Sequence, residues 1–188
     1  MSHSQVINTL SQYILTDGFH VVVDLDKSHG SWIIDAESGK RYLDCYSQFA
    51  SQPLGWNHPA LVEAQSELGH VAMHKIANSD MYSKPYAKFA ERFASITRDF
   101  RHYFFVDGGA LAVENALKAA FDWKAQRLGY TVDMSPSLNQ SLAYTLDVVH
   151  FTNAFHGRSG YTMSLTNTDP LKTRWFPKFN WTRAVNPA

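Results

Sequence analysis

The sequence predicts an α/β protein whose second half begins a doubly wound parallel sheet. The run HYFFVD at 102–107 is apolar and aromatic, as is typical of a buried strand. It is followed by ALAVENALKAAFDWKAQRLG at 110–129, where apolar residues recur at helical spacing up to Gly129. The branched run YTLDVVHF at 144–151 indicates a second strand. Two strands joined by a crossover helix form a βαβ unit, which is normally parallel and right-handed.

The first half is expected to start with strands. FHVVVDLD at 19–26 and SWIIDA at 31–36 are rich in branched apolar residues. The turn ESGK joins the second run to RYLDCY at 41–46, and together they predict a hairpin.

Helices are expected after the hairpin. Asn57 or His58 is positioned to cap the first one, and Pro59 suits the first helical position because its missing N–H would be unpaired there. SKPYAKFAERFASITRD at 83–99 has the apolar spacing of a further helix.

The composition is that of a globular protein without an electrostatic footprint. The 188 residues are 45% hydrophobic, and 17 Lys+Arg balance 17 Asp+Glu, which argues against nucleic acid or an anionic membrane as a partner. Cys45 is the single cysteine, so no internal disulfide can form. No lysine or arginine precedes Lys27, and no apolar run reaches the ~18 residues of a membrane span. We therefore expect a cytoplasmic protein.

A metal site is not expected. His70 and His74 have the i, i+4 spacing that can bind a metal on a helix, but the glutamate of HExxH and a third ligand are missing. Lys118 lies four residues after Glu114, a spacing that predicts a solvent-facing ion pair on the helix surface.

Gly108, Gly109 and Ala110 mark the turn from the first strand into the helix. Backbone N–H groups and the positive end of the helix dipole converge at such a turn, so a phosphate or carboxylate can bind there. Small residues also occur where a turn must simply be tight. The stretch lacks GK[ST] and does not have the spacing of a dinucleotide fingerprint, which leaves a small phosphorylated cofactor as the expected ligand.

FHGRSGYT at 155–162 follows the second strand, at the end where ligands of open α/β sheets bind. Phe155 could lie flat on a planar cofactor, and Arg158 could hold a carboxylate through two parallel hydrogen bonds. A core phenylalanine and a surface arginine are the alternative interpretations.

The longer wording resembles a known family. FVDGGALAVENALKAAFDWK, FHGRSGYTMSLTNTDP and the opening DGFHVVVDLDKSHGSWIIDAESGKRYLDCYSQFASQPLGWNHPAL are similar to the class III aminotransferases, and most similar to their L-lysine 6-aminotransferase group. The resemblance runs from about Asp17 to the end of the chain. It implies the fold-type-I scaffold and pyridoxal 5'-phosphate as cofactor. It also implies that 1–60 belong to the small domain and 61–188 to the first part of the large cofactor-binding domain.

The resemblance assigns roles to the two motifs. It implies that Gly108, Gly109 and Ala110 bind the cofactor phosphate. Phe155 would stack on the pyridine ring with His156 beside it, and Arg158 would bind the substrate carboxylate remote from the reacting amine. It places the loop of Gly55, Trp56 and Asn57 near the substrate entrance, although a helix-capping loop explains those residues equally well.

The implied reaction moves the ε-amino group of L-lysine to 2-oxoglutarate, normally in a homodimer. Ornithine, acetylornithine and 4-aminobutyrate are alternative donors, because each would use a similar arginine. None of the nine lysines has the context of the family's Schiff-base lysine, and the acidic partner of the ring nitrogen is not found either. We therefore expect the front part of an aminotransferase, without activity by itself. A nicotinamide-dependent oxidoreductase and a non-catalytic module that associates with an intact subunit stay open as rivals.

Overall fold

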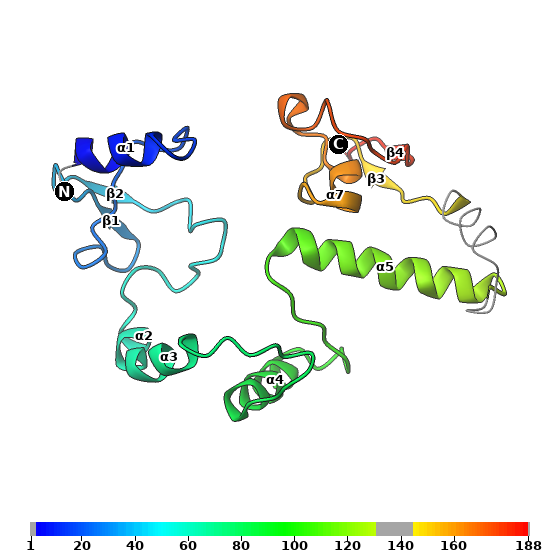
Figure 1. Cartoon of the computed structure of the whole chain (residues 1–188), viewed down its shortest axis with the longest axis horizontal. Coiled ribbons are helices and arrows are strands. Elements are labelled where there is room, and N and C mark those ends of the chain that lie inside the picture. The colour runs from blue at the N-terminus through cyan, green and yellow to red at the C-terminus, as the bar shows by residue number, and fades with distance from the viewer. Residues whose placement is uncertain (1–2, 131–144, 188) are drawn as a thin grey trace. The chain divides into compact units, whose positions relative to one another are not determined.

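The computed structural model describes residues 3–130 and 145–187. The chain forms two compact units, Met1–Arg98 and Asp99–Ala188, which are described one at a time (Figure 1). The predicted boundary after residue 60 concerns the small and large domains of the complete fold, and it stays a prediction.

The first unit begins with α1 (His3–Ser11), which the sequence pattern did not predict. The predicted hairpin is confirmed: β1 (Trp32–Ile34) pairs antiparallel with β2 (Arg41–Leu43), and Ile33 lies opposite Tyr42.

The strand predicted at 19–26 is wrong. Strand pairing with the hairpin segment is limited there to an isolated bridge between Val23 and Asp35. The reason is a local turn, because the Asp24 carboxylate accepts hydrogen bonds from the amides of Asp26 and Lys27 at 3.1 and 3.0 Å.

The predicted helices of this unit are confirmed, and so is the start signal predicted for the first one. In α2 (Pro59–Glu63), Pro59 is the first residue, and the His58 ring accepts a hydrogen bond from the amide of Ala60 at 3.2 Å. The next helix is α3 (Gln65–Ala72). Ser83 caps α4 (Lys84–Ile96) by accepting from the amide of Tyr86 at 3.3 Å.

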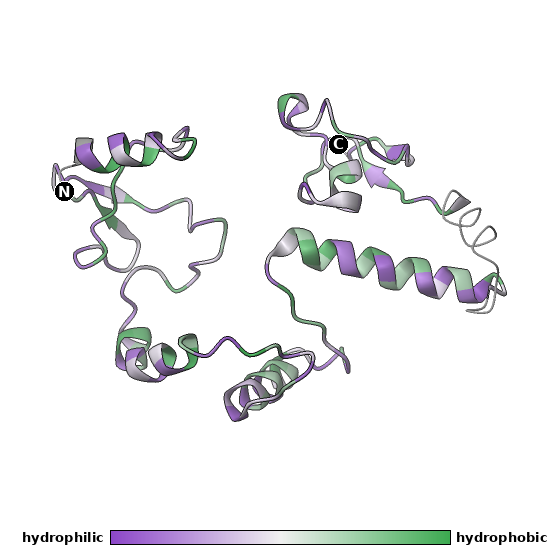
Figure 2. Cartoon of the chain, in the orientation of Figure 1, coloured by the Kyte–Doolittle hydropathy of each residue, from purple (hydrophilic) through white to green (hydrophobic). Residues whose placement is uncertain are grey.

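The second unit is organised around α5 (Gly109–Arg127). As predicted, Gly129 stops this helix: it follows the C-cap Leu128 and has φ +85°. Apolar and polar bands alternate along this helix (Figure 2). The remaining elements are β3 (His150–Phe151), α7 (Gly160–Leu165), the 3₁₀ turn η1 (Pro170–Lys172) and β4 (Arg183–Ala184).

The two predicted strands of the βαβ unit do not pair. Tyr144 lies outside the described residues, and of 145–151 only β3 is a strand; it runs parallel to β4. Residues 102–107 form no strand with any part of the chain that the structure describes. The carboxylate of Asp147 holds the segment before β3 instead, accepting from the amides of Val148 and Thr182 at 2.8 and 2.9 Å.

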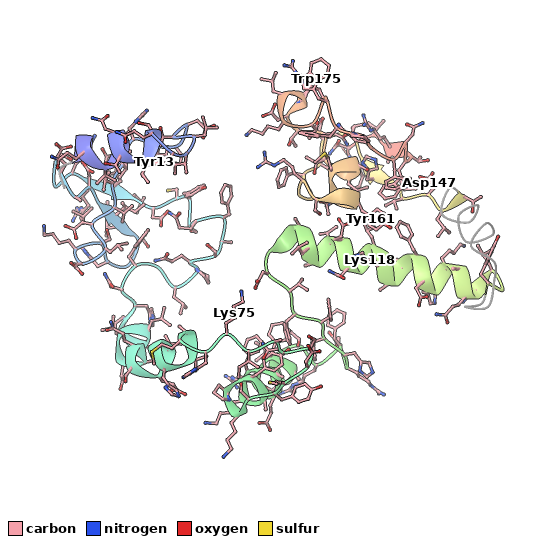
Figure 3. The ribbon with its side chains drawn as sticks, viewed as in Figure 1. Tyr13, Lys75, Lys118, Asp147, Tyr161 and Trp175 are labelled. Atoms are coloured by element: carbon pink, nitrogen blue, oxygen red, sulfur yellow. The ribbon has the colours of Figure 1, made fainter. Side chains whose placement is uncertain are left out.

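An aromatic cluster between α5, α7 and the segment before β4 forms the core of the second unit. Tyr161 lies between α7 and α5 (Figure 3), with its ring centroid 5.5 Å from that of Phe121 and 5.6 Å from that of Phe179. Phe179 stacks on Trp181 at 4.9 Å, and Trp181 is buried. The cluster fixes α7 against the second half of α5, at Phe121.

Within the described ranges, every helix is too short or too polar to cross a bilayer.

Candidate functional site

The glycine turn at the start of α5 is open to approach. Gly108 precedes the helix at φ +87°, a conformation that favours glycine, and no side chain caps the first turn. Gly109 needs no such conformation, and a Cβ built on either glycine would meet nothing within 4 Å. Tightness alone therefore does not explain Gly109. The arrangement leaves space beside backbone N–H groups at the positive end of a 19-residue helix.

The FHGR segment lies directly against this turn. Gly157 has φ +116°, and a Cβ built on it would lie 2.4 Å from the Cβ of Ala110 and 3.0 Å from the Thr162 hydroxyl oxygen. Only glycine permits that approach. The two motifs that the sequence indicated separately are thus brought into contact, at the residues Ala110 and Gly157.

Thr166 holds the middle of the segment. Its hydroxyl donates to the carbonyl oxygen of Gly157 at 2.6 Å and accepts from the amide of His156 at 3.0 Å. Thr166 is 2% exposed, so water competes little for these bonds. The backbone on either side of the His156–Gly157 peptide is therefore fixed.

Phe155 and Arg158, which flank that peptide, face outward. The Phe155 side chain is 62% exposed, so the interpretation as a core phenylalanine does not hold in the described part of the chain. Arg158 is exposed and His156 is half-buried. An exposed ring beside an open helix start is a surface that a planar anionic ligand can use.

Glu114 was predicted to face solvent, and this prediction is wrong. It is half-buried, and its carboxylate accepts from the Ser159 hydroxyl at 2.7 Å and from the amide of Tyr161 at 3.0 Å. Burial by itself raises the pKa of Glu114, but hydrogen bonds from Ser159, Tyr161 and Thr162 outweigh it, so the pKa lies below its usual value. Lys118, the expected partner, makes the smallest contribution to that shift.

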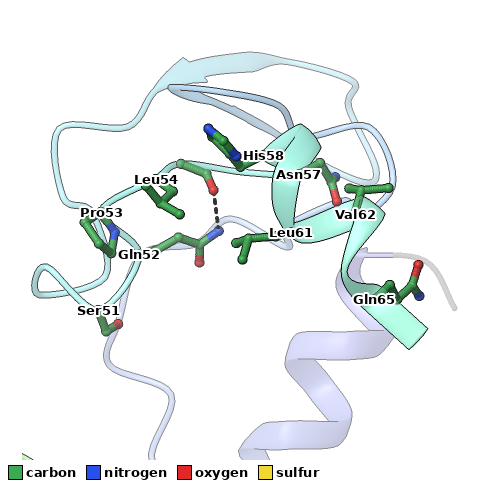
Figure 4. Close-up of a pocket in the computed structure, with 10 residues that line it drawn as sticks. Ser51, Gln52, Pro53, Leu54, Asn57, His58, Leu61, Val62 and Gln65 are labelled. Atoms are coloured by element: carbon green, nitrogen blue, oxygen red, sulfur yellow. Dashed lines mark hydrogen bonds between the residues drawn. The ribbon is translucent and has the colours of Figure 1, made fainter. Parts of the chain in front are cut away.

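The loop at Gly55 forms a second hollow, in the first unit (Figure 4). Gly55 has φ +78°, and a Cβ there would lie 2.4 Å from the carbonyl oxygen of Gly30. Gly30 and Trp56 exchange two backbone hydrogen bonds of 2.8 Å, and the Trp56 indole donates to Asp44 at 2.9 Å. Asn57 donates to the carbonyls of Leu25 and Ser28, so these residues build the loop itself.

The hollow has a volume of about 510 Å³. The Gln52 side chain donates across it to the carbonyl of Gly55 at 3.4 Å. Its described lining includes no carboxylate, lysine or arginine, and the ring of its histidine, His58, accepts the hydrogen bond that caps α2. The lining residues are Ser51, Gln52, Pro53, Leu54, Gly55, Asn57, His58, Leu61, Val62 and Gln65.

The rings of His70 and His74 lie 5.2 Å apart, centroid to centroid. Among the described residues, no group of three or more His, Cys, Asp and Glu side chains is placed to hold a metal ion.

The model of the family described as aminotransferase class III matches residues 14–186. The chain belongs to the class III aminotransferases. Members of this family depend on pyridoxal phosphate.

Within the class III family, the chain is more similar to some named relatives than to others. The L-lysine-epsilon aminotransferase of Amycolatopsis lactamdurans is 52% identical over 97% of this chain. A probable mitochondrial 4-aminobutyrate aminotransferase of Caenorhabditis elegans is 35% identical over 90% of it. The crystallised lysine aminotransferase from M. tuberculosis, in its internal aldimine form, superposes on 99% of the chain with a TM-score of 0.86 and 46% identity.

This class III chain spans about 40% of the length of the curated lysine aminotransferase that it matches, and 42% of the crystallised one. The fold-type-I assignment is confirmed for that part.

Two features of the site were not predicted from the sequence. The first is the set of hydrogen bonds that Glu114 accepts from the start of α7, which we call the clasp. The second is the fixing of the segment 155–158 by Thr166. Gly157 was visible within FHG, but its closeness to Ala110 was not. The signal that could have indicated a close approach is the small pair Ser159-Gly160, because a Cβ on Gly160 would lie 3.1 Å from the Glu114 carboxylate.

Proposed function

We propose that this chain carries two parts of the cofactor site of a pyridoxal-phosphate-dependent aminotransferase. The first is the phosphate cup, formed by Gly108, Gly109 and Ala110, and the second is the ring platform, formed by Phe155. The observation that supports it is the contact between Ala110 and Gly157, where a Cβ would come within 2.4 Å. Because of that contact, an open helix start and an exposed aromatic ring lie on neighbouring segments. A compact ligand with a phosphate at one end and a flat ring at the other matches this pairing.

In this proposal the first-turn amides at Gly108, Gly109 and Ala110 hold the phosphate, and Phe155 covers one face of the ring. The amide of His156 donates a hydrogen bond to Thr166, so His156 sets the position of the neighbouring Phe155 ring. When bound, pyridoxal phosphate supplies an electron sink through its protonated pyridine ring. The residues of this chain bind and orient it. None of the nine lysines is assigned the covalent role; Lys118, for example, lies nine positions beyond Gly109 on α5, about 13.5 Å along the axis.

The proposed donor is L-lysine, and the proposed acceptor is 2-oxoglutarate. The support is the 52% identity with a protein named L-lysine-epsilon aminotransferase, against 35% with one named for 4-aminobutyrate. Arg158, exposed beside the platform, would bind the donor carboxylate through paired hydrogen bonds. Comparing turnover of L-lysine, L-ornithine and 4-aminobutyrate by the complete protein tests this; equal rates for all three would remove the preference.

We further propose that the complete protein is a cytoplasmic homodimer. The family resemblance favours the dimer, and the free, exposed thiol of Cys45 favours a reducing compartment.

Gly109→Asp tests the phosphate cup. A carboxylate in the first turn is favourable for a helix but repels a phosphate, so the variant separates folding from binding. We expect affinity for pyridoxal phosphate, followed by absorbance titration, to fall by about tenfold or more. Affinity for pyridoxal, which lacks the phosphate, should change little.

Ala119→Asp is the matched control, because it adds the same charge at an exposed position further along α5. It should leave both affinities unchanged. Unaltered binding of pyridoxal phosphate by Gly109→Asp, or no preference of the unmodified chain for pyridoxal phosphate over pyridoxal, would refute the cup.

A further inference from the structure

Glu114 receives hydrogen bonds from three residues at the start of α7. The Ser159 hydroxyl donates to Oε2 at 2.7 Å, the amide of Tyr161 donates at 3.0 Å, and the amide of Thr162 donates at 3.4 Å. Each of these bonds spans 45 or more positions in the sequence. One carboxylate on α5 thus satisfies first-turn donors of another helix.

The ionised form of Glu114 strengthens this contact. Hydrogen bonds to a charged acceptor are stronger than those between neutral groups, and negative charge is favourable at a helix start. The lowered pKa of Glu114 agrees with a carboxylate that is ionised at neutral pH. An amide in its place would turn an N–H group toward at least one of the same donors.

The clasp closes one end of a short segment. The segment 155–158 is fixed by Thr166 at His156 and Gly157, and Glu114 fixes Ser159, the next residue. Glu114 is also five positions after Gly109 on the same helix. The helix start and the segment 155–158 are therefore both held by α5. Loss of the clasp would let Phe155 and Arg158 move relative to the helix start while α5 itself remained.

We propose that Glu114 is a positioning residue that holds the Phe155–Arg158 segment in register with the start of α5. The inference rests on the proposed function, because the register matters only if one ligand spans both parts. Glu114 touches neither the phosphate nor the ring in this proposal; it acts through Ser159 and the first turn of α7.

Glu114→Gln is the principal test, because it keeps the size of the side chain and removes the charge. We expect affinity for pyridoxal phosphate to fall by about tenfold or more, since small displacements of orienting groups are costly. Affinity for inorganic phosphate, which needs only the helix start, should stay within about twofold. The circular dichroism that the bound cofactor acquires from its surroundings should change at saturating concentration, which simple destabilisation would not cause.

Ser159→Ala removes one of these bonds, the one donated by the hydroxyl, from its other end. If the clasp acts as a unit, the double variant should bind pyridoxal phosphate no worse than the weaker of the two single variants. Asp122→Asn is the matched control: it neutralises another carboxylate of α5, whose partner is the exposed Gln126.

The outcomes separate the two proposals. If the unmodified chain does not prefer pyridoxal phosphate over pyridoxal, the proposed function fails and the inference fails with it. If that preference holds but Glu114→Gln changes neither the affinity nor the dichroism, the positioning role alone is wrong. A parallel fall of both affinities together with a lost unfolding transition would reduce Glu114 to a purely structural residue.

Discussion

Gly157 occupies a position where both space and backbone conformation exclude a side chain. Its φ is +116°, and a Cβ would lie 2.4 Å from that of Ala110. Gly157→Ala should therefore lower the free energy of unfolding by about 3 kcal/mol, through strain and overpacking together. Gly129→Ala isolates the strain, because φ is +85° there but a Cβ would meet nothing within 4 Å.

For Gly129→Ala we expect a loss of about 1 kcal/mol. Urea unfolding of both variants, followed by far-ultraviolet circular dichroism, measures the difference. Equal losses would mean that the segment does not lie against the start of α5 in solution.

His150 is a buried base with an incomplete set of hydrogen bonds. Its Nε2 finds no partner among the described residues, and its Nδ1 lies 3.3 Å from the side-chain nitrogen Nδ2 of Asn167. Burial lowers the pKa of His150 below the ordinary 6.5, and the nearby cation of Arg183 lowers it further. The neutral ring is therefore the native form.

The sign of the pH effect follows from that lowered pKa. Below about pH 6.5 the unfolded chain binds a proton that native His150 resists, so stability falls as the pH drops through this range. The midpoint of urea unfolding should decrease between pH 7.5 and pH 5.5, and His150→Phe should flatten that dependence. The same substitution at the exposed His20 serves as control; identical slopes in the two variants would contradict the assignment.

At the scale of the element, helix starts depend on single side chains. Ser83 caps α4 by accepting the amide of Tyr86 at 3.3 Å, and Ser83→Ala should lower stability by about 1 kcal/mol. Ser95→Ala, later on the same helix, is the control, because that hydroxyl only donates back to the carbonyl of Arg92. Thermal unfolding should separate the two; a cap worth no more than Ser95 would show that α4 starts elsewhere.

Helices were predictable where their signals are local. Pro59 and Gly129 each act on the backbone within a few residues, so they could be recognised from the sequence. The helix at 83–99 was predicted from its apolar spacing, and its cap, Ser83, was not named. The helix α7 was not predicted, because its first turn is satisfied by Glu114 from another element.

Strands were predictable with their extent only in the hairpin, where partner and turn are adjacent in sequence; of the strand predicted at 144–151, the described part contains only β3 at its end. The ladder of a strand depends on a neighbour, and apolar content alone does not supply one. The run at 102–107 has the composition of a buried strand but is not part of a strand in the described part of the chain.

At the scale of the whole molecule, the candidate site also combines features that are local in sequence with contacts between distant segments. Gly108, Gly109 and Phe155 could be named as candidates, because motif and ligand chemistry are properties of short stretches; their roles toward a ligand stay predictions. Their arrangement could not, because it rests on Gly157 and Glu114, whose contacts join segments more than 40 positions apart.

Large apolar side chains are mostly outside the core of this chain. In the part that the structure describes, the buried ones are Trp56, Leu165 and Trp181. By contrast, Phe104 and Trp175 are 74% and 79% exposed. Exposed apolar surface on that scale is a site of association, and the chain spans about 40% of the length of a relative with the same fold.

We therefore expect the purified chain to associate with increasing concentration and to bind a hydrophobic dye such as anilinonaphthalene sulfonate. Sedimentation velocity over a range of concentrations measures the association, and dye fluorescence measures the exposed surface. Trp175→Ser should reduce both, whereas Trp56→Ser, which removes a buried ring bonded to Asp44, should unfold the loop and increase dye binding. A single monomeric boundary without dye binding would mean that these side chains are covered within the chain itself.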